Sequence, residues 1–377
     1  MNMPTGTTKP HAPPSRLRSL WLPLGAGALA AALVAALLNG WGAPGAPASP
    51  PGIDTATAPE RLACELPASQ EATPAPGMVW VPGGTFAFGD TVYPEEQPVK
   101  NRTVQGFWMD RTEVSNAEFA AFVAATGYVT VAERPLSPAT HPELSADLLQ
   151  PGAVVFVSPK DLRQGGDPRQ WWRYVAGASW RHPGGPQTSI EGREHFPVVA
   201  VTIEDARAYA RWKGRSLPNE AQWEWAARAA RPEAPPEHEQ PLAANTWQGM
   251  FPMANSAADG FVGLAPVGCY APNALGLFDM IGNVWELTDE RYTSDHGAQD
   301  LTPPDALPPA QRKAGQAPQA AGQAEPERYV IKGGSFLCAP NYCMRYRAGS
   351  RQPQEADLGT SHLGFRTILQ AAGPKGS

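Results

Sequence analysis

The hydrophobic and polar positions of the chain form three regions: an apolar run near the amino terminus, a proline-rich stretch, and a long body of short periodic segments. The run covers residues 20–38 and contains no charged side chain. Arg16 and Arg18 precede it, and a basic flank before an apolar run of this length predicts membrane insertion with the downstream chain exported. We therefore expect residues 1–42 to be a membrane anchor or signal segment and the body to be periplasmic or otherwise extracytoplasmic. The pattern leaves open whether the segment is cleaved.

The rest of the chain divides by composition. Residues 43–76 are rich in proline and alanine, which predicts a spacer between the amino-terminal segment and the body. From residue 77 short strand patterns begin, so we expect one globular domain over 77–370, followed by a tail at 371–377. Within that domain, residues 297–327 contain few bulky apolar side chains and many Pro, Gln and Ala, a composition that predicts a flexible surface insertion.

The body contains more strand patterns than helix patterns. Residues 78–86 predict a strand, a turn and a second strand, and residues 103–109 alternate as one strand. Further strands are predicted within 329–336, 344–348 and 363–368. Consecutive strands with few helices between them favour the α+β class: a single large domain with short, mostly antiparallel strands, few helices and long ordered loops.

Three helices are predicted from their end signals. Ser115, with Glu118 three residues later, forms a capping box, and the helix that follows ends at Gly127. Thr202 and Asn219 cap the second and third helices. Apolar side chains gather on one side of each helix, so we expect these helices to be packing elements.

Composition narrows the class further. Hydrophobic residues make up 42% of the chain, too many for a disordered protein, whereas 42 prolines and 37 glycines are too many for a helical bundle. The 12 tryptophans suggest large aromatic anchors that order the loops. The net charge of −6 argues against nucleic acid as a partner.

The four cysteines, Cys64, Cys269, Cys338 and Cys343, form two candidate pairs. In an oxidising compartment an even number suggests disulfides, and whether Cys64 pairs with Cys269 stays open. A turn sequence at 339–341 separates Cys338 from Cys343, so their sulfurs can meet across a tight loop. Two interpretations fit this pair: a disulfide that closes the loop, which is the commoner outcome in a secreted chain, or two thiolates for a soft metal such as Cu(I). The spacing does not decide between them.

Other candidate chemistry gives weaker signals. The seven histidines are scattered, without the paired spacing of zinc or non-haem iron sites, and no Gly-x-Ser-x-Gly motif surrounds Ser335. Asp279 and Glu286 lie in a turn-rich segment, an arrangement that suits either Ca²⁺ or two solvated loop acids. Asn245 and Asp259 allow the same two interpretations.

Eight blocks of the body follow one another in a recognisable series. They are MVWVPGG at 78–84, FWMDRTEV at 107–114, WRHP at 180–183, RSLPNEAQWEW at 215–225, GLFDMIGNVWE at 276–286, GGSFLC at 333–338, CMRYR at 343–347 and GFR at 364–366. Any one block is a weak signal, but the full series resembles the formylglycine-generating enzyme family over essentially residues 77–370. The resemblance implies the fold of that family, which is C-type-lectin-like.

The resemblance also implies an activity. Family members with both carboxyl-terminal cysteines are copper-dependent oxidases. They use O₂ and Cu(I), held by the two thiolates, to convert a cysteine within a Cys-x-Pro-x-Arg sequence of exported sulfatases to Cα-formylglycine. Cys338 and Cys343 match these catalytic copper ligands, and Ser335 matches a residue that family members use beside the copper. The implied partner is a sulfatase polypeptide in unfolded or extended form, bound by a monomer that contacts the membrane only through its amino-terminal segment.

Two structural calcium ions are implied in the same way. The first site corresponds to Asn245, Thr246, Asp259 and Phe261, and the second to Asp279, Gly282, Val284 and Glu286. Thr246, Phe261, Gly282 and Val284 would supply backbone oxygens. We expect both ions to order loops, so their removal should lower thermal stability before it alters copper binding.

Two positions depart from the family pattern beside the expected cleft. Ala339 follows the first cysteine where relatives often have histidine, and His362 stands where relatives have a cleft asparagine. His362, Trp285 and Arg345 are the candidate substrate-binding residues. For Trp285 and Arg345, a buried indole and a structural ion pair are the alternatives. The copper chemistry therefore follows more directly from the resemblance than the choice of substrate does.

A different function stays open on the same fold. Relatives without the cysteine pair do not catalyse this reaction, so a protein-binding or scaffolding module is the alternative. An iron sulfoxide synthase would need grouped histidines, which this sequence does not have. Retention of both Cys338 and Cys343 favours the copper oxidase.

Overall fold

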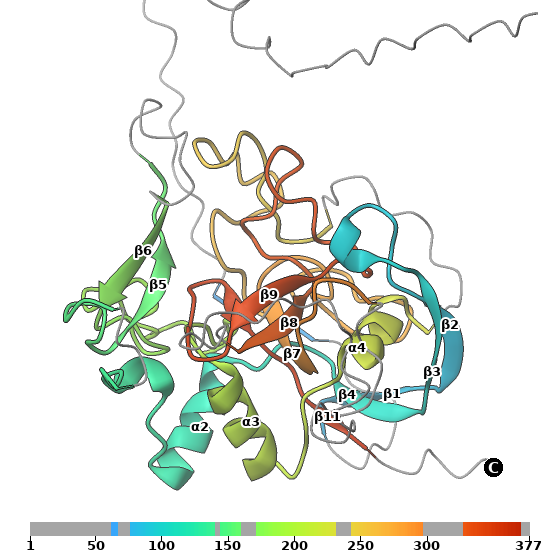
Figure 1. Cartoon of the computed structure of the whole chain (residues 1–377), viewed down its shortest axis with the longest axis horizontal. Helices are drawn as coiled ribbons and strands as arrows, with labels where there is room; N and C mark the ends of the chain where they lie inside the picture. Colours follow the sequence, from blue (N-terminus) through green and yellow to red (C-terminus); the bar gives the residue numbers. More distant parts are fainter. Residues whose placement is uncertain are drawn as a thin grey trace, which may run out of the picture. The chain divides into compact units, whose positions relative to one another are not determined.

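The computed structural model describes residues 62–66, 76–139, 144–159, 171–230, 243–296 and 327–370 (Figure 1). The chain divides into two units, Met1–Ala58 and Pro59–Ser377, and every described residue belongs to the second. The predicted anchor or signal segment, most of the spacer, the insertion up to residue 326 and the tail lie outside the described residues. No helix within the described ranges is long and apolar enough to span a bilayer.

A small three-stranded sheet ties the beginning of the domain to its end. β4 (Phe107–Asp110) lies between β1 (Met78–Val81) and β11 (Ile368–Leu369) and is antiparallel to both. Two hairpins lie between the strands of this sheet in sequence. β2 (Gly84–Phe88) pairs with β3 (Lys100–Val104) between β1 and β4, and β5 (Gly152–Phe156) pairs with β6 (Trp172–Ala176) between β4 and β11. The strand, turn and strand predicted over 78–86 are therefore confirmed.

The second sheet carries the segments that matter most for the site. Its order is β10–β7–β8–β9, formed by Leu363–Gly364, Trp285–Arg291, Arg328–Lys332 and Gln352–Glu355. All pairings are antiparallel except that of β10 with β7. Figure 1 shows β7, β8 and β9 next to one another, with α4 beside them and α2 and α3 adjacent to each other. The predicted α+β class with short, mostly antiparallel strands is confirmed.

The three predicted helices form where their caps place them. They are α2 (Asn116–Thr126), α3 (Ile203–Trp212) and α4 (Glu220–Ala227). The Ser115 hydroxyl accepts from the Glu118 amide while the Glu118 carboxylate accepts from the Ser115 amide, which satisfies two amides at the helix start. Gly127 ends α2 with a φ of 67°, a left-handed conformation that favours glycine. Single helical turns form at Pro94–Glu96 and Val131–Glu133.

Aromatic side chains fill two main core regions. Phe119 and Tyr209 pack α2 and α3 against the second sheet. Trp223 of α4 belongs to a second cluster, together with side chains of β1, β2 and β4. Trp180, Trp223 and Trp285 are among the largest fully buried side chains. Because each buried indole removes a large apolar area from water, these anchors fix long segments that have no regular secondary structure.

The structure corrects three strand predictions. Residues 103–109 form parts of two strands, because β3 pairs with β2 whereas β4 pairs with β1. Residues 344–348 form turns and no strand, because Arg345 and Arg347 form ion pairs with Glu95 and Glu96. The strand that pairs with β8 is β9 instead. Residues 363–368 contribute to β10 and β11, which belong to different sheets.

Candidate functional site

Cys338 and Cys343 lie side by side without a bond between them. Both thiols are buried, and their sulfur atoms are 3.0 Å apart. The Cys343 amide donates to the carbonyl of Ala339 at 2.8 Å, so residues 339–341 form the tight turn that the sequence predicts. The pair is a dithiol in this structure and not a loop-closing disulfide.

The two thiols differ in acidity. Burial raises the pKa of the Cys338 thiol well above its usual value, and the adjacent Cys343 raises it further. The hydrogen bond from Cys338 lowers the pKa of Cys343, and Arg345 adds to this effect against the opposing influence of burial. The pair therefore loses its first proton from Cys343 and keeps the second on Cys338. This arrangement places the more acidic thiol, Cys343, beside the less acidic thiol, Cys338.

The two sulfurs belong to the wall of a cleft of about 340 Å³. Ser335, Trp285, Arg345 and His362 line the same cleft. The structure thus brings together every residue that the sequence analysis assigned to catalysis or substrate binding. The volume lies within the range of sites that bind small molecules or short peptide segments.

Ser335 contacts the loop that carries the thiols. Its amide donates to Sγ of Cys338 at 3.5 Å, and its hydroxyl oxygen accepts from the amide of Leu337 at 3.3 Å. The side chain is fully buried. Ser335 therefore helps to fix the position of the Cys338 sulfur.

Arg345 forms the ion pair that the sequence offered as an alternative, and it also lines the cleft. Its Nη2 lies 2.6 Å from Oε1 of Glu95, and its guanidinium stacks 4.2 Å from the ring centre of Tyr93, while the residue also lines the cleft. Trp285 is likewise a buried indole, 2% exposed, and a lining residue. Glu95 lies 250 residues before Arg345, and no pattern in the sequence pairs them.

His362 presents an uncharged ring at the cleft. Burial lowers its pKa to about 3, so it is neutral at physiological pH. The ring lies edge-on to Trp172 with 4.6 Å between ring centres, and its Nδ1 has no hydrogen-bond partner in the protein. A neutral polar side chain therefore lines the cleft at this position.

Two aromatic side chains in the cleft were missed by the sequence analysis. Trp172 and Tyr342 both line it, and the Tyr342 ring stacks on Phe251 at 4.3 Å while 41% of the residue stays exposed. The available signals were the adjacent tryptophans at 171–172 and the position of Tyr342 directly before Cys343. These rings give the cleft an apolar wall.

A larger cavity of about 550 Å³ lies against α3 and contains no cysteine. Its charged side chains are mostly paired with neighbours: Arg134 with Glu204, and Arg207 with Asp289. Its lining residues include no cysteine and no histidine. The smaller cleft, which holds the two thiols, is therefore the candidate active site.

The predicted second calcium site contains more buried acid than its surroundings neutralise. Glu113, Asp279 and Glu286 are buried around one guanidinium, that of Arg366. Glu286 pairs with Arg366 at 2.6 Å and also accepts from Trp223 at 2.8 Å, so Glu113 and Asp279 supply the excess charge. Burial raises the pKa of Asp279 to about 6 and that of Glu113 well above its usual value, with repulsion from Asp279 and Glu286 adding to the latter. No three acidic side chains of the described residues lie close enough together to hold one ion, so a divalent cation that offsets this charge would need backbone oxygens as further ligands.

Glu113 is the acid that the sequence analysis missed. It belongs to the segment after β4, and its carboxylate accepts from Nδ2 of Asn283 at 3.0 Å and from the Val284 amide at 3.4 Å. These two residues lie 170 and 171 positions later in the sequence. Glu113 stood in one of the recognisable blocks, but only the fold shows that it faces the predicted site.

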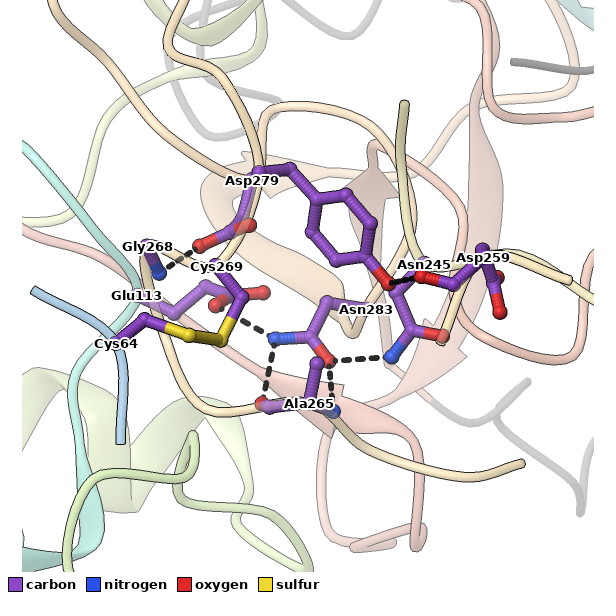
Figure 2. The surroundings of a disulfide bond; sticks show 10 residues. Cys64, Glu113, Asn245, Asp259, Ala265, Gly268, Cys269, Asp279 and Asn283 are labelled. Carbon is purple, nitrogen blue, oxygen red and sulfur yellow. Dashed lines mark hydrogen bonds between the residues drawn. A yellow bond between two sulfur atoms is a disulfide. The ribbon is translucent and has the colours of Figure 1, made fainter. Parts of the chain in front are cut away.

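The predicted first calcium site adjoins the second. The Asp259 carboxylate accepts from the Thr246 amide at 2.9 Å and from the Phe261 amide at 3.3 Å, so three of the four predicted residues converge. The fourth, Asn245, donates from Nδ2 to Oδ1 of Asn283 at 3.0 Å, which leaves its own Oδ1 out of that bond. Figure 2 shows Asn245, Asn283, Glu113 and Asp279 close together. Oxygen donors of this kind suit calcium.

The other two cysteines form a disulfide. Cys64 and Cys269 are bonded across a separation of 205 residues, which answers the question that the sequence left open. The bond lies next to the acids of the second calcium site in Figure 2. It joins residues 62–66, within the predicted spacer, to the loop before β7.

The thiol pair suits a soft monovalent metal better than it suits zinc. Among the described residues, no three His, Cys, Asp or Glu side chains lie close enough together to hold one metal ion. Two adjacent thiols without a carboxylate or imidazole partner offer the donor set that Cu(I) prefers. The residues present therefore fit the implied metal.

Comparisons with known proteins agree with this picture. Residues 63–371 match the family described as the sulfatase-modifying factor enzyme 1-like domain. The chain is 48% identical over 301 residues to the formylglycine-generating enzyme of Mycobacterium tuberculosis, covering 77% of this chain and 97% of that protein. It is 41% identical over 304 residues to the formylglycine-generating enzyme of Thermomonospora curvata, covering 78% and 93%.

A solved structure has a similar fold. The structure of PvdO from Pseudomonas aeruginosa matches with a TM-score of 0.50 and 22% identity, over 77% of this chain and 93% of that one. At this identity the likeness shows the fold alone. The matched residues include the cleft, both cysteine pairs and both acid clusters, and the chain belongs to the sulfatase-modifying factor enzyme 1-like family.

Proposed function

We propose that this protein activates exported sulfatases by oxidising a cysteine in a Cys-x-Pro-x-Arg sequence to Cα-formylglycine, with O₂ as co-substrate and Cu(I) bound by Cys338 and Cys343. The observation that carries the proposal is the buried dithiol, with 3.0 Å between its sulfurs, in the wall of a cleft. Relatives named formylglycine-generating enzymes cover more than three quarters of the chain. The substrate would be an unfolded or extended sulfatase segment, taken up by a monomer.

Each residue near the two thiols would have a separate role in such a reaction. Cys343 is the more acidic thiol and Cys338 gives up the second proton as the pair becomes a dithiolate. The redox chemistry with O₂ is supplied by Cu(I) when both thiolates hold it. Arg345 places positive charge beside the sulfurs, where it would favour ionisation of an incoming substrate thiol.

The cleft walls position the peptide. Trp172 and Tyr342 offer apolar surface to an extended chain, and His362 offers a neutral polar ring beside them. Trp285, almost fully buried, closes the cleft next to β10 and keeps water from that side. Ser335 holds Cys338 in place through its amide.

Calcium would have a structural role at the two acid clusters. The excess negative charge of Glu113 and Asp279 supports one ion, and the converging groups around Asp259 support the other. Both clusters fasten loops that lead into β7, whose first residue is Trp285 of the cleft. Calcium would thus stabilise the support of the active site without touching the thiols.

The proposed location is extracytoplasmic, with anchoring by residues 20–38. The Cys64–Cys269 disulfide supports this proposal, because such bonds persist in oxidising compartments. The basic flank of the apolar run supports it independently.

Mass spectrometry of a peptide tests the function. A peptide with the Cys-x-Pro-x-Arg sequence is incubated in air with the full chain, Cu(I) and a thiol reductant, which supplies the two electrons that O₂ does not take from the cysteine. We expect loss of the thiol sulfur and gain of an aldehyde. Cys338→Ser and Cys343→Ser should each abolish this conversion, because either change removes one of the two soft donors.

The second cysteine pair provides the matched control. The double variant Cys64→Ser, Cys269→Ser also removes two sulfurs, but from outside the cleft, and it should still convert the peptide. Conversion that persists in Cys338→Ser or Cys343→Ser would refute the assignment. Peptide binding without any conversion by the wild-type chain would favour the scaffolding alternative.

A further inference from the structure

One loop connects the disulfide to both acid clusters. Cys269 belongs to the segment 264–272, which has no helix or strand. Figure 2 shows the disulfide near Gly268, with hydrogen bonds from Gly268 to Asp279 and between Ala265 and Asn283. The loop is therefore placed to transmit a change at the disulfide to the proposed calcium sites.

The loop holds the second calcium site through its backbone. The Gly268 amide, next to Cys269, donates to Oδ2 of Asp279 at 2.5 Å. The Ala265 amide donates to Oδ1 of Asn283 at 2.9 Å, and the Ala265 carbonyl accepts from Nδ2 of Asn283 at 3.3 Å. Asn283 in turn donates to Glu113 at 3.0 Å. These hydrogen bonds fix the orientation of the Asp279 and Glu113 carboxylates.

The same loop reaches the first calcium site through a side chain. The Tyr270 hydroxyl, one residue after Cys269, donates to the carbonyl of Asp259 at 3.1 Å. This bond helps to position Asp259, whose carboxylate accepts hydrogen bonds from the amides of Thr246 and Phe261. Residues directly before and directly after the half-cystine thus contact the two sites.

The partner segment of the disulfide covers the loop. Leu66, two residues after Cys64, packs against Gly268 so closely that a Cβ at Gly268 would clash with it. The loop is also fixed by a bond from the Val267 amide to the His195 carbonyl at 2.9 Å. Loss of the disulfide would therefore loosen the loop around Gly268 and Tyr270 without detaching it.

We infer that the Cys64–Cys269 disulfide controls calcium affinity, so that both sites bind calcium tightly only when this bond is formed. The inference rests on the calcium binding proposed above. With the bond broken, the Gly268 amide no longer holds the Asp279 carboxylate in its binding orientation, and Tyr270 no longer holds the Asp259 segment. Each site must then order its own ligands when the ion binds, which weakens binding.

The redox step is a two-electron exchange. A dithiol reductant gives two electrons and two protons to the Cys64–Cys269 bond, the S–S bond breaks to two thiols, and the reductant becomes a disulfide. The bond lies at a partly exposed position, so such a reagent can reach it. Cys338 and Cys343 are already thiols and are not changed by this treatment.

Calcium titration of the full chain in detergent, by calorimetry, tests the inference. We expect the oxidised, copper-free protein to bind calcium about tenfold more tightly than the dithiol-reduced protein, a coupling of ordinary size between two sites. The double variant Cys64→Ser, Cys269→Ser should show the weaker affinity with and without reductant. Equal affinity in the oxidised and reduced wild type would overturn the inference.

Reciprocity gives a second measurement that does not depend on a variant. If reduction weakens calcium binding tenfold at each of the two sites, saturating calcium must shift the dithiol–disulfide equilibrium of Cys64–Cys269 about tenfold per site, about a hundredfold in all, toward the disulfide. A redox titration with and without calcium measures this shift, and an unchanged equilibrium would contradict the inference even if the double variant fails to fold.

The outcome is separable from the proposed function. An oxidised wild type that takes up no calcium would overturn the inference, while conversion of the peptide could still succeed. Failed conversion with redox-dependent calcium binding would leave the inference intact and reject the enzyme assignment.

Discussion

The two cysteine pairs of this domain have opposite chemistry. Cys64 and Cys269 are bonded across 205 residues, whereas Cys338 and Cys343 are five residues apart and remain thiols with their sulfurs 3.0 Å apart. The first pair fastens residues 62–66 to the loop before β7. The second pair lines a cleft, its two sulfurs are joined by a hydrogen bond, and Arg345 helps to lower the pKa of Cys343.

The comparison shows that spacing does not assign a role to a cysteine pair. A bond that closes a long loop restricts the unfolded chain far more than one that closes a five-residue loop. A disulfide between Cys338 and Cys343 would therefore add less stability than the Cys64–Cys269 bond does. Its burial, its unequal acidities and its place beside Trp285 and His362 suit a site of chemistry.

The largest expected effect is the difference in stability between a variant without the disulfide and a variant without the cleft thiols. We expect Cys64→Ser with Cys269→Ser to lower the free energy of unfolding by about 2–5 kcal/mol, because the unfolded chain gains freedom. Cys338→Ala with Cys343→Ala should lower it by only about 1–2 kcal/mol, the usual cost of a small buried truncation. Denaturant unfolding of the metal-free proteins measures both values.

The reverse order would break the comparison. If the variant without the cleft thiols lost more stability than the variant without the disulfide, the cleft pair would be the structural one. Near-ultraviolet circular dichroism of both variants, compared with wild type, checks that the tryptophan-rich core is retained before the unfolding curves are compared.

Calcium should stabilise the domain more at neutral pH than at acid pH. The pKa of Asp279 is raised to about 6 by burial in the calcium-free fold. The folded state therefore holds a proton that the unfolded state has lost between about pH 4 and 6, so stability falls as pH rises through that window. Calcium competes with this proton and opposes the loss.

Thermal unfolding with calcium and with chelator checks this sign. The gain in Tm from calcium should grow from pH 4.5 to pH 7. At a hundredfold excess over the dissociation constant the gain corresponds to about 2.7 kcal/mol. A gain that is constant over this range, or larger at pH 4.5, would contradict the charge assigned to the Glu113–Asp279 cluster.

The smallest expected effect concerns the acidity of the cleft thiols. Arg345 contributes to the lowered pKa of Cys343, so Arg345→Gln should raise that pKa and reduce the thiolate fraction at a fixed pH. Thiolate absorbance near 240 nm in copper-free protein follows the titration. Arg207→Gln, which removes an ion-paired arginine away from the cleft, serves as control, and equal curves for both variants would remove Arg345 from the account.

Local features of the fold could be predicted from the sequence. The capping box at Ser115, the stop at Gly127 and the turn between Cys338 and Cys343 depend on residues within a few positions of one another. The ordered blocks then identified the family and with it six of the residues that line the cleft.

Long-range pairings could not be predicted. Glu95 meets Arg345 across 250 residues and Glu113 meets Asn283 across 170, and neither pair has a periodic signal. The strand predicted over 344–348 failed for the same reason, since its arginines bind acids of a distant segment. The Cys64–Cys269 bond was likewise undecided until the fold placed both residues together.

Copper stoichiometry tests the central claim most directly. The reduced full chain is titrated with Cu(I) in the presence of a competing chelator, alongside the variants of each cysteine pair. The account predicts one tightly bound Cu(I) per chain in wild type and in Cys64→Ser with Cys269→Ser, and none in Cys338→Ser with Cys343→Ser. Wild-type protein that binds no Cu(I), or equal binding after loss of the cleft thiols, would contradict it.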